Sequence, residues 1–154
     1  MASKDGLPRA RGLGSSSTAR IAGLLAFLES TGLRPPEHEV LAFLTAEEGH
    51  PDNALPSYLG GLVTCMTEGG EVSHRRLPLG ADFEIVLCIP DRLVPTQQAR
   101  AVLPAHPPLA DAVFNLQRLA LLVAGFLTGD LEAIRMGASD RLHQLQRALS
   151  LIHI

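Results

Sequence analysis

The sequence predicts an α+β fold, and three observations lead to that prediction. Segments with helical periodicity come first, short β-rich runs divided by glycine pairs follow, and helices return in the second half. This order of elements is typical of layered α+β domains. The chain has 154 residues, 46% of them hydrophobic, so it is long enough to bury a core.

Three helices are expected in the first part of the chain. The first is predicted from Ser15 to about Thr31, where Gly32 is placed to end it. The second is predicted from Pro35 to about Glu48, since proline suits a first turn, and a short third helix from Asp52 to Leu59. The glycine pair at 60–61 is expected to end this third helix. Inward-facing apolar side chains are expected at Ile21, Leu24, Leu25, Leu28, Val40, Leu41 and Leu44.

Strands are expected next. The runs LVTCMT (62–67) and EVSHRRL (71–77) are β-rich, and the EGGE between them favours a hairpin. The run DFEIVLCIP (82–90) is almost continuously apolar, which predicts a strand in the centre of a sheet.

Helices are expected to return at Thr96–Leu103 and Leu109–Leu127, with one or two more in the segment 128–147. The helix at Leu109–Leu127 is apolar almost all round, so it is expected to be buried.

Composition and charge argue against several classes of function. The net charge is −3, the arginines are scattered, and there is no Trp and one Tyr, so no nucleic-acid or membrane partner is expected. The first residues are too polar for a signal peptide, and the apolar stretch Leu119–Leu127 is too short to cross a bilayer, so the expected location is cytoplasmic. Cys65 and Cys88 lie in apolar runs and are expected to be buried, reduced thiols. The six histidines lack metal-ligand spacing, which argues against a zinc site.

The segment ARGLGSSSTARIAGLLA (10–26) places glycines and hydroxyls at the start of a helix. Glycine lets a ligand approach the backbone closely, and a helix N-terminus offers unpaired N–H groups and partial positive charge. Together they suit a phosphate group, and serine hydroxyls add hydrogen bonds or metal ligands. The same residues are also common N-caps, so the pattern alone leaves both interpretations open. The segment is neither a Walker A loop nor a dinucleotide-binding fingerprint.

A second polar segment, EEGHPDNALPSYLGGLV (47–63), begins where one predicted helix ends and the next begins. Its Glu, His, Asp and Asn side chains are close enough in sequence to converge on a polar ligand. They are equally consistent with helix capping and solvated surface charge, and the pattern alone does not choose.

Four segments resemble known enzymes. The spacing from Pro8 through GLGSSS resembles the ATP-binding loop of the GHMP small-molecule kinases. EGHPDN followed by a proline and a glycine pair is similar to bacterial homoserine kinases, as are IPDRLVPTQQARAVLP, DAVFNLQRLALLVAGFLTGD and DRLHQLQR. The similarity runs from about Leu7 to about Arg147. It implies ATP-dependent phosphorylation of the L-homoserine hydroxyl to O-phospho-L-homoserine, in threonine biosynthesis.

The resemblance also implies a fold. It is the two-layer GHMP-kinase fold, with part of a ribosomal-protein-S5-like N-terminal ATP-binding domain in residues 1–68. Residues 69–148 would be part of a ferredoxin-like C-terminal domain. Because homoserine kinases are often dimers, a homodimer is a further expectation.

Site residues carry over by position. The ATP phosphates would be bound by Pro8, Arg11, Gly12, Leu13, Gly14, Ser15, Ser16 and Ser17. The catalytic Mg²⁺ would be held by Ser15 and Glu48, with Glu47 as the alternative carboxylate. An arginine fork suits the carboxylate of homoserine and an acidic side chain suits its ammonium. The homoserine-binding residues would be His50, Asp52, Asn53, Thr96, Arg100 and Arg147.

The chain also departs from this family. Arg20 is bulkier than the small residue expected after the loop, and Leu145–Gln146 replaces the usual Pro-Tyr before Arg147. Family members are much longer, with strands before the loop and a second glycine-rich motif after the substrate arm. We therefore interpret the chain as a fragment that lacks both terminal parts and is inactive by itself.

The ending LSLIHI (149–154) is apolar and unlike the family. It resembles a translated transposon end of the kind used in shotgun library preparation, so our hypothesis is a non-native tail. A genuine hydrophobic tail is the alternative.

Two other functions stay open at this point. The chain is compatible with another GHMP kinase that acts on a different small alcohol. It is also compatible with a non-catalytic remnant that binds nucleotide.

Overall fold

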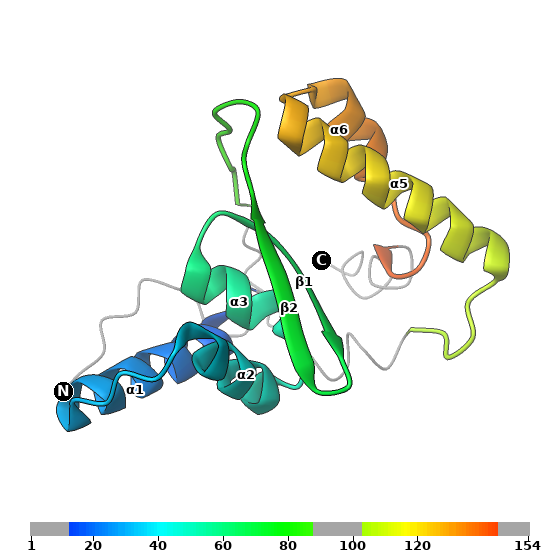
Figure 1. Ribbon diagram of the computed structural model, residues 1–154. Helices are drawn as coiled ribbons and strands as arrows, with labels where there is room; N and C mark the ends of the chain where they lie inside the picture. The colour runs from blue at the N-terminus through cyan, green and yellow to red at the C-terminus, as the bar shows by residue number, and fades with distance from the viewer. Residues whose placement is uncertain (1–12, 88–102, 145–154) are drawn as a thin grey trace. The chain divides into compact units, whose positions relative to one another are not determined.

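The computed structural model describes residues 13–87 and 103–144 (Figure 1). They form two compact units, one ending at Leu77 and the other beginning at Pro78. The first contains three helices and a hairpin, and the second contains two helices. The mixture of helices and strands confirms the predicted α+β class. The first unit extends past residue 68 because the strand at 71–77 pairs with the strand at 62–68 and so belongs to the same unit. The assignment of residues 1–68 and 69–148 to two family domains stays a prediction.

Helix α1 (Ser15–Thr31) has the predicted bounds. It lies between two glycines in the left-handed region, Gly14 with φ 71° and Gly32 with φ 69°. Residues with a Cβ rarely adopt this conformation, so glycine marks both ends of the helix. The first helical hydrogen bond runs from the Thr18 N–H to the Gly14 carbonyl, at 3.0 Å.

Helices α2 (Glu37–Glu48) and α3 (Pro51–Leu59) follow. Helix α2 starts slightly later than predicted because Pro36 disfavours helical geometry at Pro35 and is itself extended. Helix α3 begins with proline in its first turn, where a missing N–H costs nothing.

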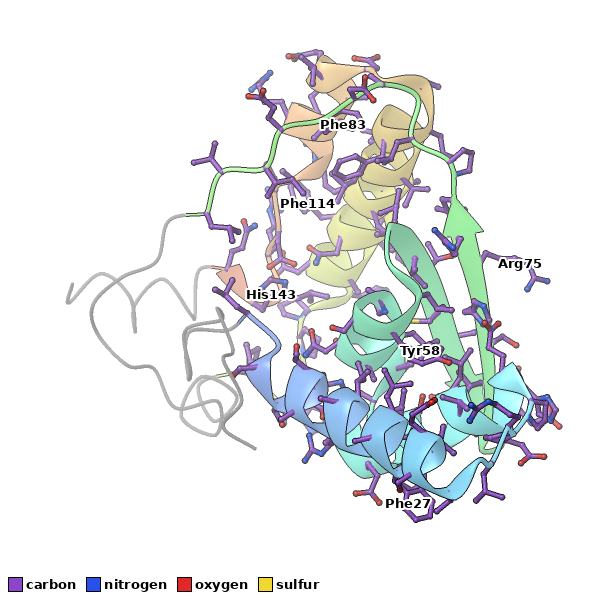
Figure 2. All side chains as sticks on the ribbon, turned by 90° about the vertical axis from the view of Figure 1, so that its left-hand side faces the viewer. Phe27, Tyr58, Arg75, Phe83, Phe114 and His143 are labelled. Atoms are coloured by element: carbon purple, nitrogen blue, oxygen red, sulfur yellow. The ribbon has the colours of Figure 1, made fainter. Side chains whose placement is uncertain are left out.

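The core of the first unit lies between these three helices. Leu41, Leu44 and Leu55 are at most 2% exposed. Burying each of them stabilises the fold by about 1.5–3 kcal/mol relative to an exposed side chain. Leu25, which was expected to face inward, is 46% exposed, because α2 and α3 cover only the stripe through Ile21. Partly buried side chains surround this core: Leu24, Leu28, Tyr58, Leu59, Val63, Cys65 and Val72. Figure 2 labels Tyr58 on α3 and Phe27 in the C-terminal part of α1.

Strands β1 (Leu62–Glu68) and β2 (Glu71–Leu77) form the predicted antiparallel hairpin. Leu62 pairs with Leu77 and Glu68 with Glu71. Gly69 and Gly70 make the turn, with φ 58° and 87°. A tight two-residue turn of this kind requires positive φ at both positions, which glycine adopts readily. Helix α3 packs on β1 and α2 on β2, so the helices cover one face of the hairpin (Figure 1).

The second unit contains α5 (Leu109–Thr128) and α6 (Leu131–Gly137). The two helices approach closely because glycines lie at their contact. A Cβ on Gly137 would come within 2.7 Å of the Leu122 Cα, and one on Gly125 within 2.7 Å of the Ile134 Cγ1. Helix α6 confirms one of the helices predicted in this segment, and Asp130 caps it by accepting hydrogen bonds from the N–H groups of its first turn.

The strand predicted at 82–90 is wrong where the structure describes it. Residues 82–87 belong to no strand, and Ile85 and Val86 are 83% and 85% exposed. An extended segment becomes a strand only when a neighbour completes its ladder of hydrogen bonds, and among the described residues none pairs with it. The rest of this prediction, and nearly all of the helix predicted at Thr96–Leu103, lies outside the described residues.

The expected burial of α5 is also wrong. Only Gly125 is buried, and Leu109 and Leu116 are 80% and 68% exposed. Among the described residues, α6, Gly80, Phe83 and the segment at 140–141 contact α5, and they leave much of its apolar surface exposed. Helix α5 is long and apolar enough to cross a membrane. Core helices of soluble proteins meet the same criteria of length and composition, so these criteria alone do not indicate a membrane span.

Candidate phosphate-binding site

The N-terminus of α1 differs from those of α2 and α3, whose first turns carry acidic residues. No side chain caps it, and its first turn holds no acidic residue. The first-turn N–H groups have no partner within the helix, and the positive end of the helix dipole is not compensated. Ser57 of α3 lies beside the turn, since a Cβ on Gly14 would be 3.8 Å from its Oγ. This end of α1 therefore suits an anion.

Two buried hydroxyls of this unit lack a hydrogen-bond partner among the described residues. Ser17, in the first turn of α1, is 1% exposed, and Thr45 of α2 is 7% exposed. A buried hydroxyl without a partner costs about 1–3 kcal/mol. The Ser17 hydroxyl thus has unused hydrogen-bonding capacity in the loop that the sequence assigns to phosphate.

Glu48 lies close to the first turn of α1. Its carboxylate forms an ion pair with Arg20, and the Nη1 of Arg20 also donates to the Ser16 Oγ at 2.6 Å. The Glu48 side chain is only 10% exposed. The structure therefore brings the predicted metal carboxylate to the predicted phosphate loop, although 28 residues separate Arg20 from Glu48.

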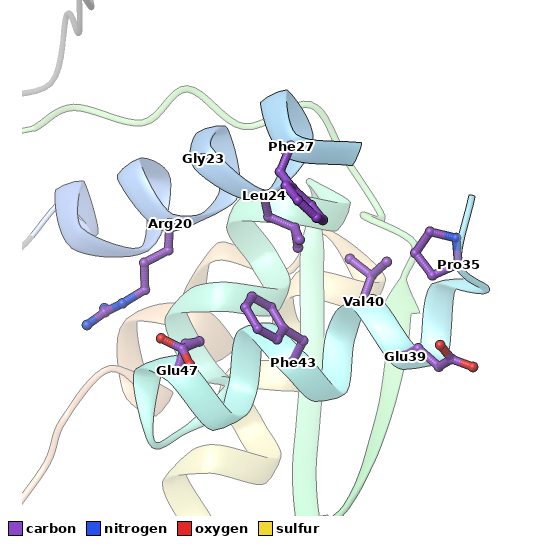
Figure 3. A pocket seen from close by; sticks show the side chains of 9 residues that line it. All are labelled: Arg20, Gly23, Leu24, Phe27, Pro35, Glu39, Val40, Phe43 and Glu47. Carbon is purple, nitrogen blue, oxygen red and sulfur yellow. The ribbon is translucent and has the colours of Figure 1, made fainter. Parts of the chain in front are cut away.

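Glu47, the alternative metal ligand, has a different environment. It lines a pocket of about 540 Å³ between α1 and α2, at the same end as Arg20 and opposite Pro35 and Glu39 (Figure 3). The floor of the pocket is apolar, with Leu24 and Phe43 among its side chains. This position favours Glu48 over Glu47 as the carboxylate that serves the loop.

His50, Asp52 and Asn53 lie together at the start of α3. The Nδ1 of His50 pairs with the Asp52 carboxylate, and Asp52 is 72% exposed, so its second oxygen is accessible to a ligand. Asn53 is exposed as well. Burial, and then the charge of Asp52, raises the pKa of the half-buried Cys65 thiol.

Ser15 and Glu48 offer two oxygen donors for magnesium, and the remaining ligands would have to come from phosphate and water. Ser15 is partly buried in the first turn of α1. It precedes Ser16, whose hydroxyl accepts from the same Arg20 nitrogen that donates to Glu48. Magnesium in kinases is commonly held by one or two protein oxygens together with substrate phosphates and water. Within 13–87 and 103–144 no three His, Cys, Asp or Glu side chains gather into a complete metal cage.

Several predicted site residues are not described by the structure. These are Pro8, Arg11, Gly12, Thr96, Arg100 and Arg147. Cys88 also lies outside the described residues. The residues that the structure does bring together all belong to the first unit.

A polar network in the second unit was not found from the sequence. Asn115 of α5 donates to the Asp140 carboxylate and accepts from the Arg141 N–H at 2.9 Å. The Oδ1 of Asp140 accepts from the N–H groups of His143 and Gln144, at 2.6 and 2.8 Å. The network holds the chain that precedes Arg147 in sequence. The residue pair is 25 positions apart, so no local pattern reveals it.

The ring of Phe114 completes this region. The guanidinium of Arg118 lies 4.7 Å from the ring centroid and that of Arg141 lies 4.0 Å from it. Burial alone would raise the pKa of Asp140, but the hydrogen bonds from His143, Gln144 and Asn115 outweigh it and lower the pKa.

Comparison with known proteins finds a matching domain model and several similar proteins. Residues 2–61 match the model of the GHMP kinases N terminal domain. Homoserine kinase of Aquifex aeolicus (strain VF5) is 43% identical over 141 residues, which are 92% of this chain and 48% of that protein. Homoserine kinase of Moorella thermoacetica is 41% identical over 143 residues, 93% of this chain and 48% of that protein.

Solved structures agree. The crystal structure of homoserine kinase from Cytophaga hutchinsonii matches with a TM-score of 0.81 at 27% identity, over 94% of this chain and 48% of that chain. A putative homoserine kinase from Listeria monocytogenes matches with a TM-score of 0.69 at 28% identity, over 96% and 50%. The chain thus spans about half the length of the relatives that it matches. By sequence and by fold, the chain is similar to the homoserine kinases, and its residues 2–61 match the N terminal domain of the GHMP kinases.

Proposed function

We propose that the chain is part of a homoserine kinase, which transfers the terminal phosphoryl group of ATP to the side-chain hydroxyl of L-homoserine. One observation carries the proposal. The uncapped N-terminus of α1, with glycine at its turn and an unpartnered hydroxyl at Ser17, lies next to the carboxylate of Glu48. These are the features that phosphoryl transfer needs, because its catalysis depends mainly on positioning and charge neutralisation.

At the phosphate end, the first-turn N–H groups after Gly14 and the hydroxyls of Ser16 and Ser17 would bind the phosphates. Ser15 and Glu48 would hold Mg²⁺, which neutralises phosphate charge when it is bound. The helix dipole of α1 adds to the attraction for the anion.

At the acceptor end, the exposed oxygen of Asp52 would pair with the ammonium of homoserine, and His50 fixes the orientation of that carboxylate. Asn53 would supply a further polar contact. Thr96, Arg100 and Arg147 are proposed for the amino-acid end on their sequence positions alone. A cytoplasmic location, a role in threonine biosynthesis and a homodimer belong to the same proposal.

The first test is nucleotide binding. A fluorescent ADP analogue is titrated into the chain and into Gly14→Val, which places a Cβ in the turn at φ 71°. Gly23→Val is the matched control, because a Cβ at Gly23 meets open space in the same helix. We expect binding by the chain and by the control, and at least tenfold weaker binding by Gly14→Val. Equal affinity of the three proteins would contradict the proposed site.

The second test is turnover. ADP release is followed with L-homoserine and with a panel of other small alcohols that GHMP kinases phosphorylate. Release that depends on homoserine supports the proposal, and release with another alcohol selects a different GHMP kinase. The second candidate is a non-catalytic remnant that binds nucleotide, and nucleotide binding without turnover is the result expected of it.

A further inference from the structure

We infer that the guanidinium of Arg20 pairs with the Glu48 carboxylate when no divalent metal is bound, so that a metal ion must displace the guanidinium to bind Glu48. This inference deepens the proposed function and rests on it, because it takes Glu48 as a metal ligand.

The position of one nitrogen carries the inference. The Nη1 of Arg20 donates both to the Ser16 Oγ and to the Oε2 of Glu48. A hydroxyl of the loop and a carboxylate are the two kinds of protein oxygen proposed above for magnesium, which binds oxygen ligands. The guanidinium therefore lies between the first turn of α1 and the carboxylate that the metal would use.

Burial makes the two cations exclusive. The Glu48 side chain is 10% exposed, so little of its carboxylate is accessible beside the guanidinium. A divalent ion and a guanidinium on the same carboxylate repel each other strongly at such short range. Binding of the metal to the Oε2 of Glu48 thus requires Arg20 to leave.

Arg20 is able to leave. Its side chain is 40% exposed, and it ends a long, flexible stem. Glu47 lines the same end of the pocket between α1 and α2 (Figure 3), so a second carboxylate is near the displaced guanidinium. Without metal, the ion pair avoids the cost of leaving a mostly buried carboxylate unpaired.

The test measures metal affinity. Mn²⁺ is titrated with ADP held constant, and the signal of free Mn²⁺ is followed by electron paramagnetic resonance. The proteins are the wild-type chain, Arg20→Gln, Glu48→Gln and the double variant. The control is Arg34→Gln, which removes an arginine from the exposed pair with Glu29 at the other end of α1. Circular dichroism checks that each variant is folded.

If Arg20 competes with the metal, Arg20→Gln binds Mn²⁺ about fivefold more tightly than wild type, the magnitude expected for loss of one partly exposed ion pair. Glu48→Gln binds it more weakly, the double variant behaves like Glu48→Gln, and Arg34→Gln behaves like wild type. Arg20→Lys keeps the positive charge but loses the guanidinium that contacts both Ser16 and Glu48, so a smaller gain in Mn²⁺ affinity is expected from it.

Unchanged or weaker Mn²⁺ binding by Arg20→Gln would overturn the inference. If Glu48→Gln still weakens binding in that case, Glu48 remains a metal ligand and only the competition fails. If Glu48→Gln leaves Mn²⁺ binding unchanged as well, the proposed metal site fails with it. Binding of the fluorescent ADP analogue without metal separates both results from a loss of the nucleotide site.

Discussion

Two helix N-termini, α6 in the second unit and α1 in the first, differ in how their polar groups are satisfied. In the second unit, Asp130 caps α6, and Asp140 accepts from two backbone N–H groups and from Asn115. In the first unit, α1 has no side-chain cap, and the hydroxyl of Ser17 is buried without a partner among the described residues. Paired groups stabilise the fold itself, whereas a buried group without a partner costs free energy. The contrast separates a helix end that is closed by its own side chain, at α6, from one that is open to an anion, at α1.

The largest expected effect tests how tightly the second unit is packed. Gly137→Ala places a methyl group 2.5 Å from the Leu122 backbone N, so α5 and α6 must move apart. We expect the free energy of unfolding to fall by about 3 kcal/mol, as for other overpacked cores. Urea denaturation followed by circular dichroism measures it.

Gly23→Ala is the control for that change. Its Cβ meets nothing within 4 Å in α1, so the variant is expected to gain about 0.5–1 kcal/mol from helix propensity. A Gly137→Ala variant as stable as this control would show that the two helices do not approach as closely as described.

The second prediction concerns Asp140. Asp140→Asn is expected to cost about 2 kcal/mol, because hydrogen bonds to a charged acceptor contribute more than neutral ones. Since the folded pKa is lowered, the stabilisation is complete above the unfolded carboxyl pKa of about 3.9 and is lost as the pH falls through the folded pKa. Unfolding measured from about pH 6 to about pH 2 should therefore show a shallower dependence on pH in Asp140→Asn. A dependence equal to that of wild type would contradict the network.

Asp130→Ala is expected to have the next largest effect. Loss of an aspartate N-cap costs about 1 kcal/mol, and here the N–H groups of Glu132 and Ala133 lose their acceptor. Hydrogen exchange at these two amides should accelerate, while affinity for the fluorescent ADP analogue stays unchanged. Reduced ADP affinity would show that the second unit also contributes to nucleotide binding.

The smallest expected effect has the opposite sign. Ser17→Ala removes a buried hydroxyl that has no partner, so stability should rise by up to about 1 kcal/mol, while ADP affinity falls severalfold. Thr45→Val removes a second buried hydroxyl that has no partner among the described residues and no proposed role, so it should leave ADP affinity unchanged. If both variants bind ADP equally well, Ser17 is not a phosphate ligand.

Local signals explain what the sequence predicted well. Helix α1 has its predicted bounds because glycine at both ends adopts positive φ. The hairpin formed as expected because the glycine pair at 69–70 satisfies a turn that other residues fit poorly. The glycine–serine turn before α1 is likewise a local pattern, since Gly14 adopts φ 71°.

The failures depend on partners distant in sequence. The run 82–87 has an apolar strand pattern but pairs with no described strand, and α5 is apolar yet mostly uncovered. The contact from Arg20 to Glu48 and the one from Asn115 to Asp140 join positions 28 and 25 residues apart. Such contacts are set by tertiary packing, so the sequence could at most mark Arg20 as unusual in size.

The position of Tyr58 has a practical consequence for optical spectroscopy. The chain has one tyrosine and no tryptophan, and Tyr58 packs against the core of the first unit. Its intrinsic emission therefore reports on that unit alone, whereas the ellipticity of the whole chain includes α5 and α6. Recording both signals during one denaturation would resolve whether the first unit unfolds together with the second or before it, without any added label.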